Sequence, residues 1–216
     1  MNSEDYRILL PAYSAVYIDI AKVASSSIKR VLADLLDLTC PDGNPHEAAF
    51  LHPGQNTETP QLYAFAFVRN PWDRLVSCYR DKIGGEVTDF THFGDSGVAR
   101  CLERFDVFYA GMRFDDFARA VAEIPDSEAD EHFRSQAVYL TDAENRLVVD
   151  FVGRYETLQA DFARLADHLE LPVSALPDLQ RAPSRNYTDF YTSATQALVA
   201  QRYARDVALF NYSFGS

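Results

Sequence analysis

The sequence predicts an α/β fold in which helices flank a parallel sheet. Apolar runs of strand length alternate with segments of helical hydrophobic periodicity. The chain has 216 residues, 47% of them hydrophobic, which suits one globular core. The two segments richest in anion-binding residues each follow a strand, and ligands bind at the carboxyl ends of strands in open sheets. We therefore expect a single domain over residues 1–216.

The first predicted strand and helix are joined by a stretch that suits a phosphate-like anion. Residues 15–20 are the strand, and apolar residues recur at helical spacing from Ile28 to Leu36. Free N–H groups at the start of the helix and its dipole favour negative charge, and a lysine adds its own. The stretch holds Lys22, Val23, Ala24, Ser25, Ser26 and Ser27.

An ordinary strand followed by a serine-capped helix would give the same pattern, so spacing alone leaves both interpretations open. The stretch is not the usual nucleotide P-loop. That loop has the pattern G-x-x-x-x-G-K-[ST], whereas the first 42 residues contain no glycine.

A second strand–helix junction has different anion-binding groups. Residues 61–68 are rich in aromatic and β-branched residues and predict a strand that leads into Arg69. Asn70 suits an N-cap and Pro71 the first helical position. Ser77 would lie two turns into this helix, where an ordinary surface serine is the simpler interpretation. Arginine suits a phosphate because its planar guanidinium binds two oxygens at once.

The two segments together resemble the cofactor motifs of sulfotransferases that use 3′-phosphoadenosine 5′-phosphosulfate (PAPS). In that family the first motif cradles the 5′-phosphosulfate, so the resemblance implies this role for residues 22–27. The second motif holds the 3′-phosphate through an arginine and a serine spaced as Arg69 and Ser77 are. The implied topology is that of P-loop kinases. The implied cofactors are PAPS as donor and 3′-phosphoadenosine 5′-phosphate (PAP) as product.

Later segments resemble the carbohydrate sulfotransferases of the Golgi, which form sulfotransferase family 2 and include the chondroitin 4-O enzymes. These segments are residues 131–133, 150–158 and 206–213. Residues 181–186 resemble the loop that closes over the nucleotide, which implies further 3′-phosphate contacts from Ser184 and Arg185. The acceptor that the resemblance implies is a hydroxyl group, most simply of a carbohydrate.

The catalytic base is expected in the irregular connection of residues 37–60, because related sulfotransferases keep a histidine or glutamate in this interval. The candidates are His46, Glu47 and His52, and for each of them a plain loop residue is an equally good interpretation. Histidine is the better chemical choice because imidazoles titrate close to working pH. His92 is a further, weaker candidate.

The remaining chain predicts more of the same architecture. Aromatic residues within 84–112 suit either a packed lid or acceptor groove, or a satellite hydrophobic cluster under a loop. His132 suits either the acceptor region or a structural hydrogen bond. We expect a third strand over residues 147–152, a helix from Leu158 capped by Thr157, and a final helix over residues 195–210.

The net charge and the cysteine content limit the classes of partner and the cellular location that we expect. The net charge is −12, so the surface repels nucleic acid, and the anionic cofactor needs a local basic pocket. Three cysteines without a C-x-x-C pattern, and an acidic start without the basic region of a signal peptide, predict a cytoplasmic protein. No run is long and apolar enough for a membrane span, and no metal-ligand pattern is visible. The eukaryotic relatives carry a membrane anchor, so we expect a soluble bacterial member of the family.

The mechanism implied is in-line displacement of a sulfuryl group by an acceptor hydroxyl that a base deprotonates, with Lys22 stabilising the leaving phosphate. Two alternatives remain at this point. A kinase-like phosphotransferase would require a glycine-rich loop, and a non-catalytic glycan-binding relative would bind nucleotide without transfer.

Overall fold

A computed structural model of the chain describes residues 6–52, 62–83, 93–177 and 186–216. These residues form two compact units, each built from two separate stretches of chain. The first unit comprises residues 1–69 and 139–183, and the second comprises residues 70–138 and 184–216. The predicted single domain over residues 1–216 stays a prediction.

The first unit contains a four-stranded sheet in the order β1-β2-β3-β4. The strands are β1 (Arg7–Leu10), β2 (Ala15–Ile18), β3 (Tyr63–Val68) and β4 (Phe151–Arg154). Strands β2, β3 and β4 are parallel, as predicted, whereas β1 pairs antiparallel with β2 at the edge. The predicted α/β class is therefore confirmed, with an antiparallel edge strand that the sequence patterns did not reveal.

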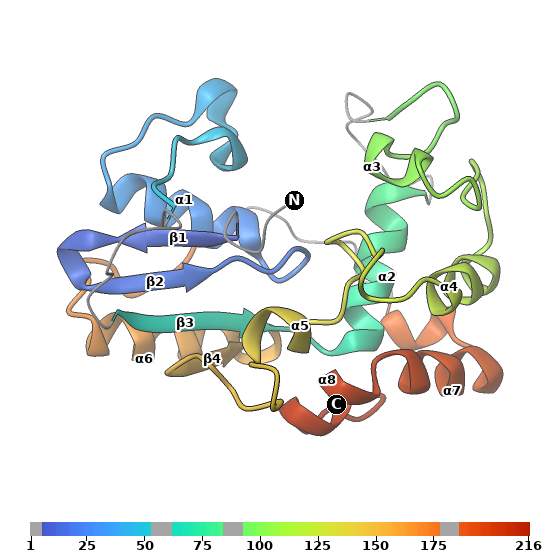
Figure 1. Cartoon of the computed structure of the whole chain (residues 1–216). Helices are drawn as coiled ribbons and strands as arrows, with labels where there is room; N and C mark the ends of the chain where they lie inside the picture. Colours follow the sequence, from blue (N-terminus) through green and yellow to red (C-terminus); the bar gives the residue numbers. More distant parts are fainter. Residues whose placement is uncertain (1–5, 53–61, 84–92, 178–185) are drawn as a thin grey trace. The chain divides into compact units, whose positions relative to one another are not determined.

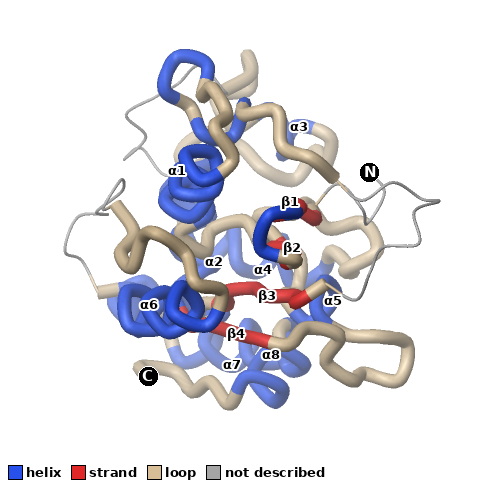
Figure 2. The backbone as a smooth tube through the Cα atoms, turned by 90° about the vertical axis from the view of Figure 1, so that its left-hand side faces the viewer, coloured by secondary structure: helices blue, strands red, loops and turns tan. Residues whose placement is uncertain are grey.

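Two helices of the first unit lie on the same face of this sheet, as Figures 1 and 2 show. Helix α1 (Ser25–Leu35) connects β2 to β3, and helix α6 (Leu158–His168) follows β4. Every residue of β2 is buried, and so are the last four of β3. The inner face of α1 contributes Ile28, Val31 and Leu32 to this core.

Short turns complete the first unit. The 3₁₀ turns are η1 (Pro11–Tyr13), η2 (Pro41–Gly43), η3 (Pro45–Glu47) and η4 (Tyr155–Thr157). Turn η1 closes the hairpin of β1 and β2, and η3 packs on α1. The predicted irregular connection therefore consists, over residues 37–52, of two short turns and a segment that reaches β1 through a hydrogen bond from the Leu9 N–H to the Leu51 carbonyl (2.9 Å).

The second unit is helical. Its elements are α2 (Pro71–Lys82), α3 (Arg100–Glu103), α4 (Phe114–Glu123), η5 (Tyr187–Phe190), α7 (Ser193–Arg202) and α8 (Ala204–Phe210). Helices α2, α4 and α7 pack against one another. The short helix α5 (Ala137–Leu140) leads the chain back to the first unit. Figure 1 shows α2, α3 and α4 in green to yellow-green, and α7 and α8 in red.

Aromatic packing fills the second unit. Phe105 and Phe108 contact each other and Phe133, and Phe108 also contacts Phe117 on α4. Phe105 and Phe108 thus belong to a hydrophobic cluster, as one interpretation of residues 84–112 predicts, and the acceptor groove stays a prediction.

Several predicted boundaries shift. The third strand begins at Phe151 rather than Leu147, because residues 141–147 form a small bridged turn instead. The predicted last helix breaks at Tyr203 into α7 and α8. Thr157 stands at the N-cap of α6, but its hydroxyl donates to Asp161 (2.9 Å) instead of accepting a backbone N–H. Among the described helices, none has the length and apolar character needed to cross a bilayer.

Candidate functional site

The turn between β2 and α1 has an unusual backbone. Lys22 and Ala24 both adopt positive φ angles, 68° and 54°, although neither is glycine. Ala24 is the N-cap residue of α1 and has no polar side chain, and the first helical bond runs from the Ile28 N–H to its carbonyl (3.1 Å). The predicted alternative of a serine N-cap is therefore wrong. The N–H groups of Ser25 to Ser27 lie in the first turn of a helix that its N-cap residue leaves uncapped, where an anion is favoured.

The carboxylate of Asp19 connects this turn to helix α1. It accepts a hydrogen bond from the Ser25 hydroxyl (2.6 Å) and forms an ion pair with Lys29 (2.6 Å). The Tyr17 hydroxyl also donates to it (3.3 Å). Burial and the negative charge of Asp19 raise the pKa of Tyr17 well above its usual value, so Tyr17 stays a donor. The first residues after β2 are thus tied to the helix that follows.

Arg69, at the end of β3, lies against the same turn. Its Nη1 donates to the carbonyl oxygen of Lys22 at 3.1 Å. Its guanidinium also stacks on the ring of Tyr155, 3.9 Å from the ring centre, and the residue is 8% exposed. The two motifs, 47 residues apart in the chain, therefore meet at the carboxyl ends of two neighbouring parallel strands.

This arrangement brings anion-binding groups together at the carboxyl ends of β2 and β3. The N-terminus of the 11-residue helix α1 and the Arg69 guanidinium both lie against the turn that contains Lys22, and Lys29 balances the charge of the Asp19 carboxylate. A helix N-terminus attracts anions through its N–H groups and dipole, and an arginine adds a planar pair of donors. The site suits a ligand with phosphate or sulfate groups.

His46 contacts the first motif directly. Its Nε2 lies 2.8 Å from the Ser26 hydroxyl, and its Nδ1 lies 3.4 Å from the ammonium of Lys29. An ammonium group only donates, so Nδ1 is an acceptor here and a neutral ring then carries its proton on Nε2. In this arrangement both ring nitrogens of His46 have partners.

His52 lies along β1 and is held differently. Its Nδ1 is 2.6 Å from the carbonyl oxygen of Arg7, which stands opposite Ile18, the last residue of β2. A carbonyl only accepts, so Nδ1 carries the proton and Nε2 of a neutral ring has the lone pair. Glu47 is exposed, and its carboxylate accepts a hydrogen bond from the Asn44 side chain (3.1 Å).

The other predicted site residues fall elsewhere. Ser77 lies on α2 in the second unit, where it is partly exposed. The predicted cap of this helix is confirmed, because the Trp72 N–H donates to the Asn70 side chain (3.2 Å). Ser184, Arg185 and His92 lie outside the described residues.

Asp19 and Tyr155 are site residues that the sequence patterns did not single out. Asp19 directly follows a buried strand, and a carboxylate at that position next to a lysine-containing turn is a usable signal. Tyr155 has no such signal, because its contact with Arg69 depends on the pairing of β3 with β4.

A separate hollow of about 430 Å³ lies at the opposite end of the strands. Residues that line it include Ser14, Tyr63 and Asp150, which lie at or next to the amino ends of β2, β3 and β4. Ligands of open sheets bind at the carboxyl ends, so we do not assign this hollow to the anion site.

Comparison with known proteins gives a consistent result. The sequence model described as "Sulfotransferase family" matches residues 7–213. Carbohydrate sulfotransferase 11 of Rattus norvegicus is 25% identical over 234 residues, covering 93% of this chain and 65% of that protein. Carbohydrate sulfotransferase 14 of Homo sapiens is 29% identical over 222 residues, covering 93% of this chain and 58% of that protein.

Carbohydrate sulfotransferase 10 of Mus musculus is 22% identical over 205 residues, covering 88% of this chain and 58% of that protein. The chain thus spans less than two thirds of the length of these relatives. No solved structure matches the chain.

Proposed function

Because the chain belongs to the sulfotransferase family, we propose that it transfers a sulfuryl group from PAPS to a hydroxyl of a carbohydrate acceptor. The observation that carries this proposal is the contact between the two motifs, in which Arg69 donates to the Lys22 carbonyl beside the N-terminus of α1. Two anion-binding motifs that meet at the carboxyl ends of neighbouring strands suit a nucleotide with anionic groups at both its 5′ and 3′ positions.

We assign the 5′-phosphosulfate to the N-terminus of α1. The N–H groups of Ser25, Ser26 and Ser27 would hold its oxygens, and the Lys22 ammonium would meet the bridging oxygen. During transfer the S–O bond to the phosphate breaks, and the electron pair stays on that phosphate oxygen. Lys22 stabilises the charge that develops there, which is electrostatic stabilisation of the transition state.

We assign the 3′-phosphate to Arg69. The Tyr155 ring and the Lys22 carbonyl hold its guanidinium in a fixed orientation, so little side-chain entropy is lost when it binds an anion. Ser77, Ser184 and Arg185 stay predicted contacts of the same phosphate.

We propose His52 as the base that accepts the proton of the acceptor hydroxyl. The Arg7 carbonyl holds the proton on Nδ1, so Nε2 offers a lone pair. His46, whose ring nitrogens face Ser26 and Lys29, would instead position the first motif. The carbohydrate acceptor rests on relatives that are named carbohydrate sulfotransferases.

Calorimetric titration with PAP tests the cofactor assignment. The Arg69→Lys variant should bind PAP at least about tenfold more weakly, because lysine has no planar fork that could stack on Tyr155 and donate at the same time. Arg146→Lys is the matched control, since Arg146 is 73% exposed on the turn before β4. Equal affinity in wild type and Arg69→Lys would contradict the assignment. Binding of ATP with Mg²⁺ in place of PAP would favour a phosphotransferase.

Steady-state kinetics with labelled PAPS and a panel of sugars test the base. His52→Asn should lower kcat by about 10²- to 10⁴-fold, because the acceptor hydroxyl then loses its proton acceptor. His46→Asn and Glu47→Gln should lower kcat much less. A loss of this size in His46→Asn and not in His52→Asn would move the assignment to His46. PAP binding without transfer to any sugar in the panel would favour a glycan-binding relative.

A further inference from the structure

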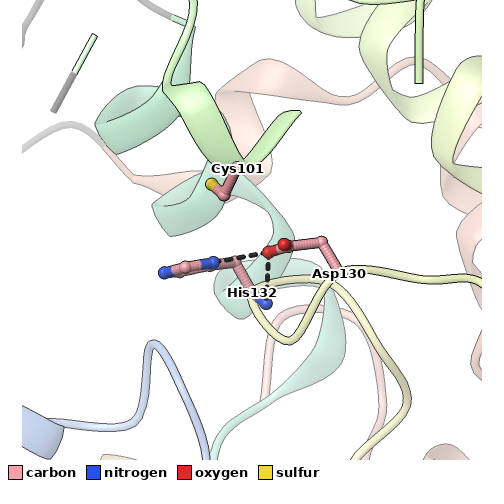
Figure 3. Close-up of side chains that lie close together, drawn as sticks. All are labelled: Cys101, Asp130 and His132. Atoms are coloured by element: carbon pink, nitrogen blue, oxygen red, sulfur yellow. Dashed lines mark hydrogen bonds and ion pairs between the residues drawn. The ribbon is translucent and has the colours of Figure 1, made fainter. Parts of the chain in front are cut away.

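Three potential metal ligands from two segments of the second unit lie close together. Figure 3 shows Cys101 on α3 above the side chains of Asp130 and His132. The Cys101 sulfur, a carboxylate oxygen of Asp130 and a ring nitrogen of His132 all lie within 4.8 Å of one another. His132 Nδ1 is 2.6 Å from Asp130 Oδ1, and the same oxygen accepts the backbone N–H of His132 (3.1 Å).

The turn that contains Asp130 and His132 is held rigidly. The backbone N–H groups of Phe133 and Arg134 donate to the Asp130 carbonyl (3.1 and 2.8 Å). The guanidinium of Arg74, which is 2% exposed, donates to the carbonyls of Glu131 and Arg134 (2.9 and 2.8 Å). A buried arginine on α2 thus clamps the segment that carries two of the three groups. Outer contacts of this kind orient the ligands of metal sites.

The types of donor atom select the ion. Thiolate sulfur and imidazole nitrogen suit zinc and its neighbours in the transition series, whereas Mg²⁺ and Ca²⁺ prefer sites made of oxygen. Tetrahedral zinc keeps ligands at about 2.0–2.3 Å, so its ligand atoms stand roughly 3.3–3.7 Å apart. The present separations bracket that spacing, because His132 Nδ1 and Asp130 Oδ1 are 2.6 Å apart and all three donor atoms lie within 4.8 Å of one another.

We propose that Cys101, Asp130 and His132 form a binding site for a zinc-class divalent cation. Cys101 would bind as a thiolate after releasing its proton to water, His132 through Nδ1, and Asp130 through one carboxylate oxygen. Water would complete the four-coordinate shell. The ion would replace the present hydrogen bond between His132 and Asp130. This proposal is independent of the proposed sulfuryl transfer.

Access and charge are compatible with this site. The side chains of His132 and Asp130 are 17% and 11% exposed, so an ion can enter from solvent while most of the shell stays enclosed. A thiolate and a carboxylate together neutralise a divalent cation. Arg104 approaches Asp130 only at 4.0 Å and is 58% exposed, so it can move away.

Metal analysis of the purified chain tests the proposal. After equilibrium dialysis against Zn²⁺, the wild type should retain one zinc per chain, and Cys101→Ser and His132→Asn should each bind it at least about tenfold more weakly. Titration with Co²⁺ should produce a thiolate-to-metal charge-transfer absorption band that Cys101→Ser lacks. Cys40→Ser is the matched control, because Cys40 is also a free, half-buried thiol but lies in the first unit.

The outcome that overturns the proposal is equal zinc affinity in wild type and Cys101→Ser, or loss of the cobalt band in Cys40→Ser. Absence of bound zinc in a folded wild type would also overturn it. Near-ultraviolet circular dichroism establishes that each variant is folded. Should Cys101→Ser fail this check, Cys101→Ala takes its place. Asp130 is not substituted, because its carboxylate also accepts a backbone N–H of its own turn.

Discussion

Arg69 shows how one side chain can belong to both motifs. Its guanidinium donates to the backbone of the first motif and stacks on Tyr155, so its orientation is set before any ligand arrives. The contact to the first motif is made to the Lys22 carbonyl and not to the lysine side chain. Substitution of Lys22 therefore leaves the junction of the two motifs in place.

The Lys22 ammonium is expected to act on the reaction and not on the fold. Lys22→Ala should lower kcat by about 10²- to 10³-fold, the usual loss when one preorganised group at a developing charge is removed. The melting temperature should change little, because Lys22 is only half-buried and alanine keeps the same backbone. Transfer of labelled sulfate and thermal melting measure the two effects.

Arg146→Ala is the control, since it also removes one positive charge from the first unit at a largely exposed position. A folded Lys22→Ala variant with wild-type turnover would contradict the role proposed for Lys22.

At the scale of elements, the turn between β2 and α1 contains backbone strain. A left-handed conformation costs a non-glycine residue about 1–2 kcal/mol, and both Lys22 and Ala24 adopt it. The hydrogen bond from Ser25 to Asp19 and the ion pair between Asp19 and Lys29 stabilise this conformation. We interpret this strain as a consequence of the backbone path that leaves the N–H groups of the first helical turn available to an anion.

Glycine at position 24 should relieve part of this strain. Ala24→Gly should leave the free energy of unfolding unchanged or raise it by up to about 1 kcal/mol, because the relief exceeds the entropy that glycine adds to the unfolded chain. Ala33→Gly, at a fully buried position of the same helix, should lower it by at least about 1 kcal/mol. Urea unfolding measures the free energy of unfolding of both variants. Equal losses in Ala24→Gly and Ala33→Gly would contradict the presence of strain at Ala24.

Helix α6 is joined to β4 by a buried carboxylate. Asp161 accepts hydrogen bonds from the Arg154 N–H (2.7 Å) and the Thr157 hydroxyl (2.9 Å), and pairs with Arg164 (2.7 Å). Burial by itself would raise the pKa of Asp161, but these hydrogen bonds outweigh it and lower the pKa. A lowered folded-state pKa stabilises the fold above the unfolded-state value of about 4, and this stability is lost as pH falls through the folded-state pKa.

Asp161→Asn should therefore lower the free energy of unfolding by about 1–3 kcal/mol at neutral pH, and the difference from wild type should shrink in acid. Urea unfolding at neutral pH and at about pH 3 measures the difference in the free energy of unfolding between Asp161→Asn and the wild type. Asp167→Asn, at an exposed position of the same helix, is the control. A difference that stays constant down to acid would show that the charge of Asp161 is not responsible.

At the scale of the whole molecule, neither compact unit is a continuous piece of chain. Each is completed by a segment that returns after the other unit has begun, which favours folding as one cooperative body. We expect a single calorimetric transition with equal calorimetric and van't Hoff enthalpies. PAP at 100 times its dissociation constant should stabilise the fold by about 2.7 kcal/mol and shift this transition as a whole. Two separate peaks would contradict the prediction of one domain.

Some parts of the fold and of the candidate site could be predicted from the sequence, and others could not. The strand, the turn and the helix around Lys22 could be predicted because each has a local signature, namely apolar runs, small residues and helical spacing. The edge strand β1 could not, because its four residues, an arginine followed by three apolar residues, show no alternation of polar and apolar side chains in the sequence. The partners of Arg69 and the cluster of Cys101, Asp130 and His132 depend on residues distant in the chain.

Local periodicity and the types of neighbouring residues were sufficient to predict the α/β class and the two strand–turn–helix motifs in their order. Long-range packing fixed which side chains lie together. Strand pairing brought Arg69 to the Lys22 carbonyl, and a carbonyl on β1 selected the tautomer of His52. Such contacts arise only when segments far apart in the chain pack together, and no local pattern records them.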